Sequence, residues 1–119
     1  GLVYLLNIIT LTADITYSPK ACDEIVILYS IDYGTSKYTV FIILSNAFLQ
    51  NHAIKSISFS EFSEICIIYG NAFVDSTLEK ICIPPHLEIL CDGWCNGTTN
   101  LDSVIVSPKN KKFACADGK

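Results

Sequence analysis

The second half of the sequence repeats one six-residue pattern at a nearly constant interval. An apolar residue, two polar residues, and then two apolar residues flanking a variable one occupy positions 54–59, 78–83 and 101–106. A second motif at 45–48 (SNAF) returns 25 residues later at 70–73 (GNAF), and more weakly at 92–95 (DGWC). Two interleaved motifs with one period are typical of a solenoid, in which each repeat forms one coil.

The first motif has the alternation of a β-strand. In 78–83, a strand places Ile81 and Ile83 on one face and Lys80 and Cys82 on the other. Pro84 and the proline after it then end the strand, because proline cannot donate to a sheet ladder.

The rest of each coil contains a second short strand and a tight corner. The apolar runs 65–68 and 87–90 predict the second strand, and 71–74 has room for one helical turn with Phe73 pointing inward. Cys95 takes the position of Phe73 in the weaker copy, so we expect it in the core. One coil cannot bury its apolar face alone, but stacked coils can.

These motifs resemble the BspA-like branch of the leucine-rich repeat superfamily. The resemblance covers 38–119 and is carried by Leu78, Ile81, Ile83 and Pro84, by 70–73, and by the closing phrases 107–113 and Asp117-Gly118. It implies a β-rich α/β fold: a right-handed solenoid with two short strands and a helical turn per coil. The segment 59–62 lacks the proline and predicts an irregular coil.

Three regions are expected along the chain: an apolar segment at 1–13, an N-terminal β-hairpin cap at 14–44, and leucine-rich repeats of about 23–24 residues at 45–119. The hairpin is predicted from two β-rich runs, 25–31 and 38–44, joined by a turn that contains Gly34. We expect further repeats or a cap beyond 119, because Leu101, Val104, Val106 and Phe113 would otherwise stand at an open edge.

The segment 1–13 has two interpretations. It is either the remains of a secretory signal, with 11–13 as its cleavage site, or a strand of the cap. Its apolar run is too short to span a bilayer, so we expect no membrane span in this segment.

Composition argues against nucleic-acid binding. The 119-residue chain has a net charge of −4, and its eight Lys and Arg residues form no basic patch.

Six cysteines raise the question of metal or disulfide sites: Cys22, Cys66, Cys82, Cys91, Cys95 and Cys115. No CxxC pair exists, and neither His52 nor His86 has ligand spacing to Cys91 and Cys95, so we expect no metal and no other cofactor. Free thiols are favoured over a disulfide framework, because the spacings follow the repeat.

The sequence also lacks catalytic motifs. It has no Gly-rich phosphate loop and no GxSxG elbow, and we expect that the protein is not an enzyme. Asn96-Gly97-Thr98 is an N-glycosylation sequon and a weak indication of secretion.

Outward strand positions of a repeat line up into one continuous face, which solenoids commonly use to bind partners. Here the predicted face comprises Ser56, Ser58, Glu79, Lys80, Cys82, Asp102, Ser103 and Ile105. Cys82 either faces solvent there or is covered by neighbouring side chains.

By resemblance, the implied function is protein binding within a cell-surface or secreted adhesion protein, with a host-cell or matrix protein as partner. An intracellular protein–protein scaffold and a structural spacer remain open alternatives.

Overall fold

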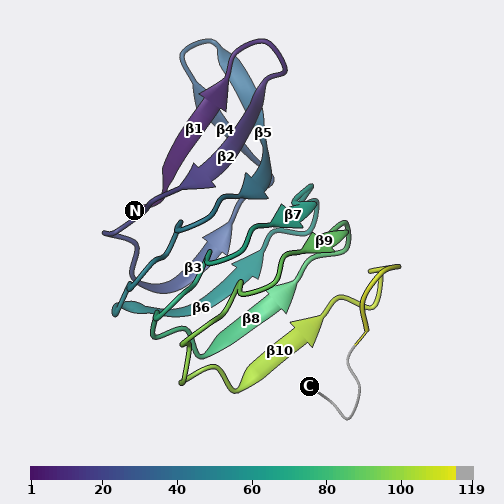
Figure 1. The fold of residues 1–119 in the computed structure, drawn as a ribbon. Helices are drawn as coiled ribbons and strands as arrows, with labels where there is room; N and C mark the ends of the chain where they lie inside the picture. Colours follow the sequence, from purple (N-terminus) through teal and green to yellow (C-terminus); the bar gives the residue numbers. More distant parts are fainter. Residues whose placement is uncertain (115–119) are drawn as a thin grey trace.

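The structure, a computed structural model, describes residues 1–114, which form an all-β solenoid without a helix (Figure 1). The ten strands are β1 Val3–Asn7, β2 Thr12–Thr16, β3 Asp23–Ile27, β4 Ser30–Tyr33, β5 Ser36–Ile43, β6 Ile54–Phe59, β7 Ile67–Ile68, β8 Lys80–Ile83, β9 Ile89–Leu90 and β10 Ser103–Val106. Cys115, Asp117 and Gly118, which the sequence analysis named, lie outside the described residues.

The strands form two sheets that enclose the core. The back sheet has the order β1-β2-β5-β7-β9, with β4 paired to β5, and the front sheet has the order β10-β8-β6-β3. From β2 onward, each coil gives one strand to each sheet, in the pairs β2–β3, β5–β6, β7–β8 and β9–β10. The chain therefore winds through about four coils, with parallel pairing between equivalent strands (Figure 1).

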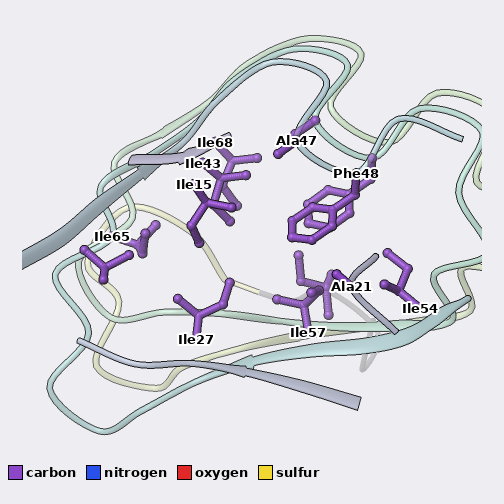
Figure 2. Packing of buried hydrophobic residues seen from close by; sticks show 14 of the residues in the cluster. Ile15, Ala21, Ile27, Ile43, Ala47, Phe48, Ile54, Ile57, Ile65 and Ile68 are labelled. Atoms are coloured by element: carbon purple, nitrogen blue, oxygen red, sulfur yellow. The ribbon is translucent and has the colours of Figure 1, made fainter. Parts of the chain in front are cut away.

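Parallel register stacks the inward side chains into rows. In the back sheet Ile15, Ile43 and Ile68 are direct partners and fully buried. In the front sheet Ile57 pairs with Ile81 and both are fully buried. Figure 2 shows Ile15, Ile43 and Ile68 on one side of the core and Ile57 on the other. Each such side chain contributes about 1.5–3 kcal/mol by leaving water.

Aromatic side chains fill the corner between the back and front strands. Phe48 and Phe73 are both fully buried, and their rings stack. Figure 2 shows Phe48 in this corner. Trp94 of the next coil meets Phe73 edge-on, with centroids 6.1 Å apart. Cys95, expected in the core, is half-buried, and Trp94 makes the ring contact instead.

The predicted α/β class and helical turn at 71–74 are wrong. The amides of Asn71, Phe73 and Asp75 donate to carbonyls of the following coil, at 2.8–3.0 Å. The intervening amides of Ala72 and Val74 close four-residue β-turns within their own coil by donating to the carbonyls of Tyr69 and Asn71. Because every second amide in this segment donates to the next coil, the ladder of i to i−4 hydrogen bonds that defines an α-helix cannot form.

Left-handed backbone recurs at the same two positions of this corner. Asn46, Asn71 and Gly93 have φ near 63°, 62° and 77°, and the position four residues later repeats the conformation at Gln50, Asp75 and Gly97. Asn, Asp and Gly tolerate positive φ best. Two left-handed residues in each corner turn the backbone from the back sheet toward the front sheet without a helix.

The predicted N-terminal hairpin is shorter than expected. β4 and β5 pair antiparallel around Gly34, whose φ is +63°. Residues 25–27 belong instead to β3, which pairs in parallel with β6 in the front sheet. The split follows burial, because Ile27 enters the core of the first coil while Leu28 and Tyr29 are exposed at the bend.

The N-terminal segment forms β1, the antiparallel partner of β2. Tyr4 and Leu6 pack against the core, while Leu5, Ile8 and Leu11 are exposed.

The segment 59–62 is irregular. Phe62 is 67% exposed, and its ring meets Tyr29 edge-on at 6.1 Å. The Ser60 hydroxyl is buried without a hydrogen-bond partner in the described part of the chain.

Candidate binding face

The outer side of the front sheet contains most of the predicted binding residues. Register places Glu24, Ser56, Lys80 and Ser103 in one row across its four strands. In the next outward row Val26 pairs with Ser58, and Cys82 pairs with Ile105. Parallel pairing at the strand spacing thus brings together side chains far apart in the sequence.

Glu79 and Asp102 lie just before this face, at the start of the strands. The amides of Asp102 and Ser103 both donate to the Glu79 carbonyl, at 3.0 and 3.3 Å. The Glu79 amide donates to the Lys55 carbonyl at 2.8 Å. The three charged side chains at 55, 79 and 102 are exposed, and the charge is positive at Lys55 and negative at Glu79 and Asp102.

The strands of the front sheet end at a groove of about 360 Å³. Its lining includes Ser58, Cys82 and Ile105 of the predicted face, together with Pro85 and Pro108 from the loops that follow β8 and β10. Ile105 is 46% exposed, and Cys82 is half-buried rather than fully exposed. The face is therefore polar at the strand starts and apolar at the strand ends.

The prolines and Lys109 of this groove were not among the predicted site residues. Pro85 and Pro108 are 23 residues apart, the same offset that pairs β8 with β10, so the loops that leave these strands repeat in sequence as the strands do. This spacing could have indicated a second set of repeated surface positions, but Pro84 and Pro85 were interpreted only as the end of a strand and Pro108 only as part of the closing phrase 107–113.

The five cysteines of the described residues are unpaired: Cys22, Cys66, Cys82, Cys91 and Cys95. Burial raises the pKa of the Cys66 thiol, and the carboxylates of Glu88, Asp14 and Glu64 raise it further. His52 and His86 are exposed. Residues 1–114 contain no group of three or more His, Cys, Asp or Glu residues arranged to hold a metal ion.

Asn96 of the sequon is exposed on the corner of the last complete coil. Gly97 is left-handed there, and the Thr98 hydroxyl donates to the Cys95 carbonyl. None of the described segments is a helix able to cross a membrane.

Comparison with solved structures finds chains that resemble this one. The chain superposes on the crystal structure of the pneumococcal vaccine antigen PcpA with a TM-score of 0.63 at 16% identity, over 94% of this chain and 37% of that one. A leucine-rich cell-surface protein from Faecalibacterium prausnitzii A2-165 gives a TM-score of 0.47 at 18% identity, over 92% of this chain and 42% of that one.

This chain thus spans about two-fifths of those structures. No model of a known protein family and no curated protein sequence matches it. What the comparison with PcpA establishes is a shared fold.

Proposed function

We propose that the chain is a non-enzymatic, protein-binding repeat module of the BspA-like leucine-rich-repeat type, and that it belongs to a cell-surface or secreted adhesion protein. The observation that carries this proposal is the front face. One continuous row of outward side chains crosses all four strands, and a groove of about 360 Å³ lies at the strand ends. Solenoids commonly bind partners on such an aligned face.

The lining of the groove suits a protein ligand. Ile105, Pro85 and Pro108 offer apolar contact, while Ser58 and Ser107 offer hydroxyl groups. Protein interfaces combine an apolar centre with a polar rim, and here the charged residues Glu79, Lys80 and Asp102 lie toward the other end of the strands.

The surface location has two supports. The fold is shared with PcpA, which is described as a vaccine antigen. The sequon residue Asn96 is exposed, as attachment of a glycan would require.

A binding assay on immobilised extracellular-matrix proteins tests the ligand class. Lys80→Glu reverses a charge on the front face, and Ile105→Ser removes the exposed apolar side chain of the groove. Each is expected to weaken binding at least fivefold. The control Ile9→Ser changes a side chain that is 90% exposed in the turn between β1 and β2, and should leave binding unchanged.

Equal binding by Lys80→Glu, Ile105→Ser and the unaltered chain would remove the front face as the binding site. Labelling intact cells with an antibody to this segment tests the location. Labelling that requires permeabilisation would favour the intracellular scaffold, and a surface signal without affinity for any protein tested would favour the structural spacer.

A further inference from the structure

Asn96 lies in the connection between β9 and β10, at the corner of the last complete coil (Figure 1). Of the seven asparagines in the sequence, it is the one followed by glycine. Glycine carries no side chain that would hinder its backbone nitrogen from approaching the amide carbon of the preceding residue. Asparagine is a thermolabile residue, and this approach begins the reaction by which it loses ammonia. The hydrogen bonds around each asparagine therefore decide which one can react.

Hydrogen bonds restrain the other six asparagines. In three of them the side-chain Oδ1 accepts from two backbone amides: Asn7, Asn51 and Asn110. In the other three the amide of the next residue donates to a backbone carbonyl: Asn46, Asn71 and Asn100. The first restraint fixes the side chain, and the second keeps the proton on the nitrogen that would attack it.

Neither restraint applies to Asn96. Within residues 1–114, its side chain and the Gly97 amide have no hydrogen-bond partner, and both residues are exposed. The Thr98 amide donates to the Cys95 carbonyl at 3.1 Å, which closes a β-turn with Asn96 and Gly97 at its centre. Water therefore has access to the Asn96 side-chain amide and to the nitrogen that follows it.

We propose that Asn96 is a site of spontaneous deamidation, and that its products weaken the contact with the neighbouring corner. The Gly97 nitrogen gives its proton to solvent hydroxide and forms a bond to Cγ of Asn96. The Cγ–Nδ2 bond breaks, and the amide nitrogen takes a proton from water and leaves as ammonia. A second water hydrolyses the five-membered imide at either carbonyl, giving aspartate or isoaspartate at position 96. No oxidant or reductant is needed.

The products disturb the contact with the corner at 71–75. The Asp75 amide donates to the Asn96 carbonyl at 2.8 Å. Isoaspartate lengthens the backbone by one methylene and replaces this carbonyl by a free carboxylate. The Asp75 side chain lies against Gly97, since a Cβ built on Gly97 would overlap Oδ1 of Asp75. Either product thus adds a negative charge beside an existing one. Conversion also removes the glycosylation sequon, which requires asparagine at 96.

Incubation of the purified chain at mildly alkaline pH, followed by peptide mass spectrometry, tests the reaction. Asn100 is the internal control, because it is equally classed as exposed but the amide after it, that of Leu101, donates to the Thr98 carbonyl at 3.1 Å. Asn96 should convert at least tenfold faster than Asn100, and Asn96→Gln should leave no conversion at this position. Equal rates at Asn96 and Asn100 would overturn the proposal.

The same measurement in urea separates the sequence motif from the folded corner. The native chain should convert Asn96 within tenfold of the rate in the unfolded chain. A greater suppression in the native chain would show that the corner protects Asn96, and would overturn the proposal.

Urea unfolding of freshly prepared variants tests the consequence. Asn96→Asp reproduces the aspartate product and should lower the urea midpoint, whereas Asn100→Asp adds the same charge on the same loop and should not. The loss caused by Asn96→Asp should be smaller in an Asp75→Asn background, because the neighbouring charge is absent. Equal midpoints for Asn96→Asp and Asn100→Asp would overturn the proposed weakening. These outcomes do not depend on ligand binding, so this inference and the proposed function can fail separately.

Discussion

The rings of Phe48 and Phe73 stack with centroids 5.0 Å apart and an angle of 9° between their planes. They occupy equivalent positions of successive coils, 25 residues apart. The Phe48 amide also donates to the Ala72 carbonyl at 2.7 Å, so backbone and side chain join the same two coils. In a solenoid each coil contacts only its neighbours, and such interfaces account for much of the stability.

Replacing Phe73 should therefore destabilise the fold strongly. Phe73→Ala removes a fully buried ring that contacts both Phe48 and Trp94, and should lower the free energy of unfolding by about 3–5 kcal/mol. The matched control Phe62→Ala deletes a ring that is 67% exposed, and should cost about 1 kcal/mol or less. Urea unfolding measures both losses. Equal losses would show that the stacked ring of Phe73 contributes no more to stability than the exposed ring of Phe62.

Asn51 joins the first coil to the second through its side chain. Its Nδ2 donates to the Ala21 carbonyl at 2.8 Å, and its Oδ1 accepts from the amides of Ala53 and Ile54 at 2.8 and 3.1 Å. Asn51→Ala leaves the buried Ala21 carbonyl and Ile54 amide without this partner and should lower the free energy of unfolding by about 2–3 kcal/mol, as measured by urea unfolding. The exposed neighbour His52 is the control, and a loss in His52→Ala as large as that in Asn51→Ala would contradict the bridging role.

Asn110 repeats this arrangement in the last coil. Its Nδ2 donates to the carbonyls of Pro84 and Leu87, at 2.8 and 3.2 Å, while its Oδ1 accepts from the amides of Lys112 and Phe113. The same side-chain chemistry thus links coils at both ends of the solenoid.

The repeated strands were predictable because their periodicity is local. Ile57 and Ile81 are buried partners as the alternation indicated, and Ser56 and Lys80 lie side by side on the opposite face. The helical turn was mispredicted because the amide of Phe73 bonds to the next coil, a partner that local sequence does not identify. The first coil was missed because β2 and β3 lack the repeated phrase, although Ile15 and Ile27 are fully buried.

The outward row of the back sheet, which includes Ile42 and Ile67, was hidden for a different reason. Each back strand presents two adjacent aliphatic residues, as in Ile42-Ile43 and Ile67-Ile68, of which one faces inward and one outward. Alternation cannot assign the faces when both residues are apolar. Only the strand register identifies the faces: Ile43 and Ile68 are partners in the core, so their neighbours Ile42 and Ile67 form the outer pair.

Gly70 is required by the close approach of the next coil. A Cβ built on it would lie 2.7 Å from the Asp92 carbonyl oxygen, a backbone atom that cannot move away freely. Gly70→Ala should therefore lower the free energy of unfolding by about 1–3 kcal/mol. Gly34 has φ +63° but no atom within 4 Å of its Cβ position, so Gly34→Asn is a control that should cost under about 0.5 kcal/mol. If urea unfolding shows no loss for Gly70→Ala, the coils are not so closely packed.

Asp14 should make a small pH-dependent contribution to stability. Burial raises the pKa of its carboxyl above the ordinary value, so the folded chain holds this proton more tightly than the unfolded chain does. The contribution of Asp14 to stability therefore falls as pH rises through the window between its unfolded and folded pKa values. Asp14→Asn should raise the urea midpoint slightly at pH 7, and the difference should vanish below the unfolded pKa of about 4. A lower midpoint for the variant at pH 7 would contradict the sign.

Cys66 should react more slowly than Cys22 with iodoacetamide in the native protein. Burial raises the pKa of the Cys66 thiol, and Glu88 and Asp14 raise it further, while Cys22 is exposed. Alkylation needs the thiolate and access, so Cys66 should be labelled at least tenfold more slowly at pH 8, as measured by peptide mass spectrometry. Glu88→Gln removes one of the charges acting on the thiol and should accelerate labelling of Cys66. Glu24→Gln changes the net charge equally on the front sheet and should not. Equal acceleration by both variants would show that net charge, rather than the carboxylate of Glu88, holds the thiol protonated.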